Sequence, residues 1–141
     1  IKKAFYLSAI EQTEGDYYEF GVYTGSSFTH AIRCAKFNEK FDPGLTSIKF
    51  YGFDSFEGFG NLDDSEKHSF YTDINFKTDY KKVFHRVNKI LPSDRFELVN
   101  GFFEETLIWD LLLPDLDFVV LRFGTAIILK FQTYYIFWEI I

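Results

Sequence analysis

The stretch Gly15–Ser27, GDYYEFGVYTGSS, constrains the fold of this chain more than any other part of its sequence. Asp16–Phe20 is rich in residues that favour strands, and it includes one acid, Glu19. Gly21–Gly25 predicts a tight turn, because glycine adopts a positive φ without steric cost. A helix is predicted to follow, with one apolar face made by residues at helical spacing: Phe28, Ala31, Ile32 and Ala35. A strand, a glycine turn and a helix in this order form a ligand-binding corner in many α/β proteins.

The rest of the chain continues to alternate between helix and strand patterns. Helices are predicted over Ile1–Glu14, after the glycine turn, over Asn75–Leu91 and over Glu104–Leu113. Strands are predicted over Asp16–Phe20, Ile48–Phe53 with Asp54 at its end, Arg95–Asn100 and Leu116–Phe123. We expect Gly15 to end the first helix and Ser26 or Ser27 to cap the second. The alternation predicts an α/β fold with a Rossmann-like, doubly wound and mostly parallel sheet.

The residues that most suggest a ligand site follow the carboxyl ends of the predicted strands. They are Glu19–Gly25, Asp54–Gly58 and Gly101–Glu104, and ligands of doubly wound sheets bind at this edge. An acid at the position of Asp54 binds the two hydroxyls of a ribose in such folds. The alternative for Asp54 is a helix cap or turn residue.

The glycine turn does not match a dinucleotide site. The pattern GxGxxG is absent, because Tyr23 stands where the second glycine should be. Glu19 would repel a pyrophosphate but would suit the ammonium group of an amino acid. The alternative is a structural turn with a surface acid and no ligand.

Composition excludes some classes of function. The net charge of −6 argues against a nucleic-acid binder, which needs a basic face. Cys34 is the only cysteine, so no disulfide framework is expected. The apolar stretch 118–141 is interrupted by Arg122, Lys130 and Glu139, so no membrane span is expected. No signal peptide is visible, and we expect a cytoplasmic protein.

Four blocks of the sequence together resemble one family. GDYYEFGVYTGSS, YGFDSFEGF, RFELVNGFFEETL and FVVLRF are similar, in this order, to successive blocks of the macrocin O-methyltransferase family. The resemblance covers roughly Gly15 to Phe123. It implies a class I methyltransferase that uses S-adenosyl-L-methionine and methylates a hydroxyl of a sugar or another small molecule.

The resemblance also implies roles for individual residues. Asp54 would hold the ribose, with Ser55 and Phe56 beside it, and Gly101 and Phe102 would flank the adenine. His68, in the loop that would cover the acceptor, is the candidate base for the acceptor hydroxyl; the alternative is a solvated loop histidine. The methionine part of the cofactor would be surrounded by Glu19, Gly21, Tyr23, Thr24, Gly25 and Ser26.

The resemblance stops after Phe123. Family members continue with an Asp-x-Asp motif that takes part in binding a divalent metal such as Mg²⁺, and here Gly124–Lys130 reads GTAIILK. We therefore expect a partial methyltransferase domain over residues 1–123 and an atypical apolar tail over 124–141, with no metal ligands. Codons for Gly124–Lys130 read in another frame permit Asp-Gly-Asp-Tyr-Leu-Glu, so a frameshift near Phe123 is the working hypothesis. On this interpretation the chain is a fragment that is poorly soluble, because its sheet edge and apolar face are left uncovered, and has little activity.

Three further interpretations stay open. One is a non-catalytic domain that at most binds the cofactor. Another is a Rossmann-type enzyme for NAD or a sugar nucleotide, which the missing GxGxxG pattern disfavours. The third is a soluble interaction module with no ligand.

Overall fold

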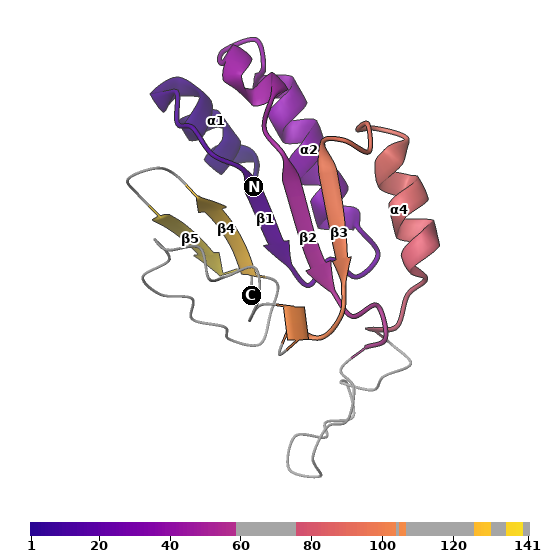
Figure 1. Ribbon diagram of the computed structural model, residues 1–141. Helices are drawn as coiled ribbons and strands as arrows, with labels where there is room; N and C mark the ends of the chain where they lie inside the picture. The colour runs from indigo at the N-terminus through magenta and orange to yellow at the C-terminus, as the bar shows by residue number, and fades with distance from the viewer. Residues whose placement is uncertain (59–75, 104, 107–125, 131–134, 140–141) are drawn as a thin grey trace.

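The computed structural model describes residues 1–58, 76–103, 105–106, 126–130 and 135–139, the last two ranges as backbone only (Figure 1). Its helices are α1 (Lys2–Glu11), α2 (Ser26–Asn38) and α4 (Tyr80–Asn88), with a short 3₁₀ helix at Pro43–Thr46. Its strands are β1 (Tyr17–Phe20), β2 (Phe50–Asp54), β3 (Phe96–Asn100), β4 (Ala126–Lys130) and β5 (Tyr135–Glu139).

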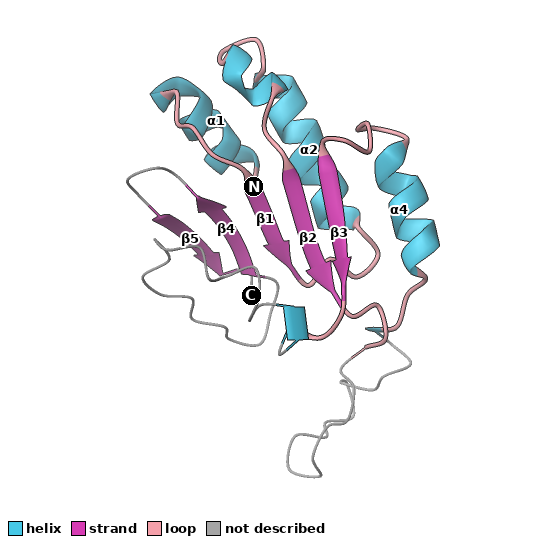
Figure 2. Cartoon of the chain, in the orientation of Figure 1, coloured by secondary structure: helices cyan, strands magenta, loops and turns pink. Residues whose placement is uncertain are grey.

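The sheet has the order β3-β2-β1-β4-β5. β1 pairs in parallel with β2, and β2 pairs in parallel with β3, as the helix–strand alternation predicts. The expected three parallel strands of an α/β fold are therefore confirmed, with helices between them (Figure 2).

The other edge of β1 differs from the prediction. β4 pairs with β1 antiparallel, and β5 pairs with β4 antiparallel. The predicted fourth strand Leu116–Phe123 lies outside the described residues, as does most of the predicted helix Glu104–Leu113. The tail after Phe123, expected to be atypical, supplies both β4 and β5.

One face of the sheet packs against all three described helices. The buried cluster there joins residues of α1, α2 and α4 to residues of β1, β2 and β3. Period-two alternation places Tyr17 and Glu19 of β1 on this face. The predicted apolar face of α2 is confirmed, since the four residues that define it are all buried: Phe28, Ala31, Ile32 and Ala35.

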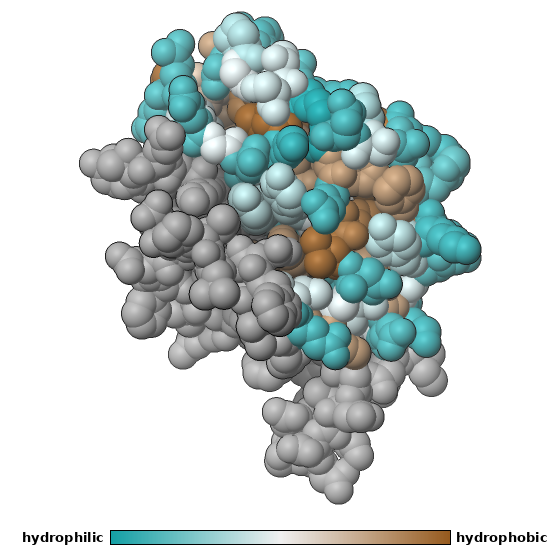
Figure 3. All heavy atoms as spheres, in the orientation of Figure 1, coloured by the Kyte–Doolittle hydropathy of each residue, from teal (hydrophilic) through white to brown (hydrophobic). Residues whose placement is uncertain are grey.

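The opposite face of the described sheet is aromatic. Tyr18 of β1 stacks on Tyr51 of β2 with ring centroids 4.9 Å apart, and Phe20 stacks on Phe53 at 5.0 Å. Figure 3 shows an apolar area on this side, over β2 and β3. Phe103, in a short helical turn after β3, packs edge-on against Phe20 with ring centroids 6.0 Å apart. None of α1, α2 and α4 lies on this face, so the second helix layer of a doubly wound fold stays a prediction.

The helices begin and end at capping residues, which the spacing of apolar residues does not predict. α1 ends at Glu11, followed by Gln12 as a left-handed C-cap with φ 51°, and does not extend to Gly15. α4 begins after Asp79, whose carboxylate accepts a hydrogen bond from the Lys81 N–H at 2.8 Å, so the predicted start at Asn75 is wrong. Pro43–Thr46 forms a 3₁₀ helix that begins after Asp42.

Candidate functional site

The turn between β1 and α2 has the left-handed backbone that its glycines predict. Gly21 has φ 86° and Gly25 has φ 76°, and Tyr23 between them is also left-handed at φ 49°. A Cβ on Gly25 would lie 3.0 Å from Cγ1 of Val83 in α4. Glycine is therefore required at position 25 both by its φ and by the close approach of α4.

Gly25 itself occupies the N-cap position of α2, and no side chain caps this helix. The prediction that Ser26 or Ser27 is the cap is therefore wrong. The side chains of these serines are used elsewhere: Ser26 Oγ lies 3.0 Å from Thr24 Oγ1, and Ser27 Oγ donates to Glu19. Among the described residues, no side chain accepts from the first N–H groups of α2.

Asp54, at the end of β2, connects two turns. Its Oδ2 accepts a hydrogen bond from the Tyr23 N–H at 2.7 Å, and its Oδ1 accepts one from the Phe56 N–H at 2.6 Å. The sequence predicted that Glu19 and Asp54 meet at one edge of the sheet, and the structure brings them together there. Burial is the main cause of the raised pKa of Glu19, and the negative charge of Asp54 adds a smaller increase.

Glu19 is completely buried, with 0% of its surface exposed. Its Oε2 accepts a hydrogen bond from the Tyr17 hydroxyl at 2.6 Å, and its Oε1 accepts one from the Ser27 hydroxyl at 2.5 Å. Both oxygens thus have internal donors, so Glu19 is enclosed and not presented at the surface of the turn. The surface acid of the alternative interpretation is excluded.

Burial governs the titration of this group. Loss of solvent raises the pKa of Glu19 from 4.5 to about 7, against the opposing effect of the hydrogen bonds from Ser27 and Tyr17. The same burial, with the negative charge of Glu19 next, raises the pKa of Tyr17 well above its usual range. Tyr17 is therefore a neutral donor, and Glu19 changes charge near neutral pH.

The two residues predicted to lie beside the ribose, Ser55 and Phe56, have different roles in the turn after β2. Phe56 is buried and packs edge-to-face on Tyr80, with ring centroids 5.3 Å apart, so its side chain belongs to the core. Ser55 Oγ donates to the Gly58 carbonyl at 3.0 Å and accepts from the Glu57 N–H, which closes the turn after β2.

At the end of β3, the Gly101 N–H donates to the Asp54 carbonyl at 3.1 Å. Phe102 follows and is half-buried, and its carbonyl begins a short turn to Thr106. A Cβ on Gly101 would lie 2.7 Å from Thr106 Cγ2, which favours glycine here. The three strand ends predicted to form one site are therefore adjacent.

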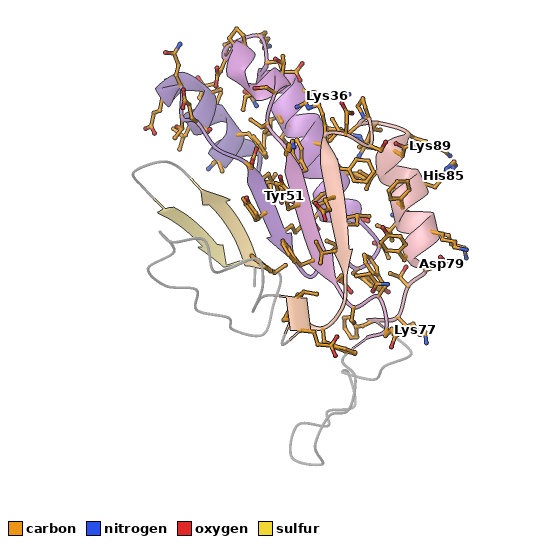
Figure 4. All side chains as sticks on the ribbon, viewed as in Figure 1. Lys36, Tyr51, Lys77, Asp79, His85 and Lys89 are labelled. Carbon is orange, nitrogen blue, oxygen red and sulfur yellow. The ribbon has the colours of Figure 1, made fainter. Side chains whose placement is uncertain are left out.

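Sequence reasoning missed three residues that shape the site. Tyr17 and Ser27 hold the Glu19 carboxylate, and Arg86 of α4 donates from Nη1 to the Thr24 carbonyl at 2.6 Å. Tyr17 could have been found, because residues two apart on a strand share a face. Arg86 carries no such pattern, since its contact depends on how α4 packs. Figure 4 shows α4 beside the sheet, with Asp79, His85 and Lys89 along it.

The two described histidines and the cysteine do not form a second site. His68 lies outside the described residues. His85 is exposed on α4, and exposed His30 has its Nε2 3.5 Å from Sγ of buried Cys34. Within the described ranges, no group of three His, Cys, Asp or Glu side chains could hold a metal ion.

Two further observations concern the chain as a whole. In the part of the chain that the structure describes, no helix has the length and apolar character needed to cross a membrane. Comparison of the chain with protein-family models, with curated proteins and with solved structures finds no match.

Proposed function

We propose that this chain binds S-adenosyl-L-methionine across the carboxyl ends of β1, β2 and β3, as part of an O-methyltransferase for a hydroxyl of a sugar or another small molecule. The observation that carries this proposal is the hydrogen bond from the Tyr23 N–H to Asp54 Oδ2. It fixes a strand-end acid beside a glycine turn, which is where doubly wound folds bind a ribose.

Asp54 has acceptor capacity left for the ribose. A carboxylate offers about four lone-pair positions, and the described hydrogen bonds from Tyr23 and Phe56 occupy one on each oxygen. Asp54 is also only half-buried. The two remaining positions suit the two adjacent hydroxyls of a ribose, one on each oxygen.

The turn suits an amino acid. The uncapped N–H groups at the start of α2 are donors for a carboxylate, and the positive end of the helix dipole favours one. Ionised Glu19, with Asp54 beyond it, gives the same corner a negative charge that attracts an ammonium group. S-adenosylmethionine carries both groups on one carbon, whereas a pyrophosphate would meet two acids.

Gly101 and Phe102 would flank the adenine. The hydrogen bond from Gly101 to the Asp54 carbonyl keeps the end of β3 next to the ribose position. Phe102 offers an aromatic ring for a flat base. Together the three strand ends match the three parts of the cofactor in order.

When bound, the cofactor supplies an activated methyl group on its sulfonium. The protein mainly supplies proximity and orientation for the acceptor hydroxyl. His68 is the proposed base for the hydroxyl proton. The resemblance also implies Mg²⁺, but no described cluster of residues fits it, so no step is assigned to a metal.

The proposal includes the finer features of fold and context. The sheet would be the N-terminal portion of a doubly wound, class I methyltransferase fold of the macrocin O-methyltransferase type, in a cytoplasmic protein. A second candidate is a domain that binds the cofactor without transferring its methyl group. The sequence GTAIILK at Gly124–Lys130, where the family has its Asp-x-Asp motif, favours this candidate.

Calorimetry tests the binding claim. The chain should bind S-adenosylmethionine and S-adenosylhomocysteine, and Asp54→Ala should remove most of this affinity, whereas Asp16→Ala, on the opposite end of β1, should retain it. Binding of NAD in place of both compounds would overturn the proposal. Transfer of a labelled methyl group to a sugar hydroxyl then separates an enzyme from a domain that only binds.

A further inference from the structure

We propose that Ser27 receives the ammonium group of the cofactor, and that Glu19 acts behind it by fixing the Ser27 hydroxyl as an acceptor toward the ligand. The inference rests on the proposed function, because it names the residue that binds the ammonium group of S-adenosylmethionine. Ser27 would be a binding residue, and Glu19 and Tyr17 would be positioning residues.

Burial separates these roles. Glu19 and Tyr17 are each 0% exposed, so neither is open to contact a ligand. Ser27 is half-buried at the second position of α2, beside the turn. It is therefore the accessible end of a hydrogen-bonded chain that runs from Tyr17 through Glu19 to the surface.

The direction of the hydrogen bonds follows from the chemistry of the groups. An ionised carboxylate only accepts, so both hydroxyls donate their protons to Glu19. A serine hydroxyl has one proton and two lone pairs, and in the described part of the chain the Ser27 hydroxyl bonds to Glu19 alone. What it presents outward is then a pair of acceptors, which pairs with an ammonium group and not with a carboxylate.

The surrounding charges agree with a cationic ligand group. The described groups that act on Glu19 are Tyr17 on its own strand, Ser27 on α2 and Asp54 on β2. None of the three is a cation. An ammonium group at Ser27 Oγ would therefore lie beside the Glu19 carboxylate, while the guanidinium of Arg86 at the same turn is engaged by the Thr24 carbonyl.

A conservative substitution of Glu19 should reverse the direction of the hydrogen bond that the Ser27 hydroxyl makes with it. In Glu19→Gln the side chain has one acceptor oxygen and one NH₂ donor. The oxygen must face Tyr17, because an unpaired hydroxyl proton in the core is costly. The NH₂ group then donates to Ser27, whose proton turns outward and no longer suits an ammonium group.

Two ligands isolate this effect. S-adenosylhomocysteine has the amino-acid end, and 5′-deoxy-5′-methylthioadenosine has the adenosine and sulfur without it. Glu19→Gln and Ser27→Ala should each weaken S-adenosylhomocysteine binding about tenfold and leave methylthioadenosine binding within about twofold. Ser47→Ala, an exposed serine in the turn that follows the 3₁₀ helix, is the control and should change neither.

The outcomes are distinguishable. If the variants lose affinity equally for both ligands, or for neither, the inference about Ser27 is overturned. The proposed cofactor site itself is not overturned by that result, as long as the unmodified chain binds the ligands. Failure of the unmodified chain to bind either ligand refutes the proposed function. A measurement without ligand tests whether the Ser27 hydroxyl donates to Glu19. In a ¹³C NMR titration the pKa of Glu19 should be higher in Ser27→Ala than in the unmodified chain. An unchanged pKa overturns the inference.

Discussion

Asp54 at the end of β2 accepts a hydrogen bond at 2.7 Å from the backbone N–H of Tyr23, which lies 31 residues earlier in the chain. The strand end therefore holds the preceding glycine turn as well as its own turn at Phe56. One carboxylate thus fixes the relative position of two loops that the proposed site requires.

Asp54→Asn should destabilise the protein by about 1–3 kcal/mol, because the asparagine NH₂ would face a backbone N–H and leave it unpaired. Urea denaturation measures this. Asp16→Asn is the matched control. In the described part of the chain only Oδ1 of Asp16 accepts a hydrogen bond, from the Lys49 N–H at 2.8 Å, and an amide oxygen can do the same. Equal losses in the two variants would show that the double acceptor role of Asp54 is unimportant.

Gly52→Ala should also destabilise the fold, by about 1–3 kcal/mol through overpacking. Gly52 pairs with Glu19 across the sheet, and a Cβ there would lie 2.7 Å from Val22 Cγ2 and 2.9 Å from Leu98 Cδ2. Thermal unfolding would measure the effect. Gly44→Ala, where the added Cβ would meet only the Asp42 carboxyl group, should cost less; a larger loss at Gly44 would contradict this account.

The stability of the protein should fall as the pH rises through neutrality. Burial raises the pKa of Glu19 from 4.5 to about 7, so the folded state holds a proton that the unfolded chain releases. The resulting stabilisation, roughly 3 kcal/mol, is complete below pH 4.5 and is lost as the pH approaches and passes 7. Free energies of unfolding at pH 5 and pH 8 measure it.

Glu19→Gln provides the comparison for this pH dependence. The glutamine side chain cannot titrate, so the variant should lose less stability than the unmodified chain between pH 5 and pH 8. Other ionisable groups contribute to both proteins and cancel in the comparison. The same pH dependence in both proteins would mean that Glu19 does not titrate as its burial indicates.

Arg86→Gln should loosen the turn without unfolding the domain. The guanidinium donates to the Thr24 carbonyl at 2.6 Å, and the contact is exposed, so its effect on global stability should stay below about 1 kcal/mol. Amide hydrogen exchange at Gly25, whose N–H donates to the Val22 carbonyl, should become several-fold faster. Lys89→Gln, exposed on the same helix, should leave this rate unchanged.

The features that the sequence predicted correctly are those set by the spacing of apolar residues and by the positions of glycines. The three parallel strands, the buried face of α2 and the positive φ at Gly21 and Gly25 followed from those patterns. The meeting of Glu19 with Asp54 followed from the rule that parallel strands end at one edge.

What the sequence did not predict depends on individual hydrogen bonds. Ser27 fits the pattern of a helix cap, yet its hydroxyl bonds to Glu19, because the strand places a buried carboxylate within its reach. The capping role of Asp79 was hidden by the apolar residue Phe76, which extended the helical pattern too far. The antiparallel neighbour of β1 was missed because β-propensity sets neither direction nor partner.

The pairing of β1 also has a consequence for how the chain is made. Glu19 pairs with Gly52 on one side and with Ile127 on the other, separations of 33 (52 − 19) and 108 (127 − 19) residues. During synthesis one edge of β1 can close early, but the other stays open until residues 126–130 leave the ribosome. Until then, the strand that carries the buried acid would offer an open edge for pairing with another molecule.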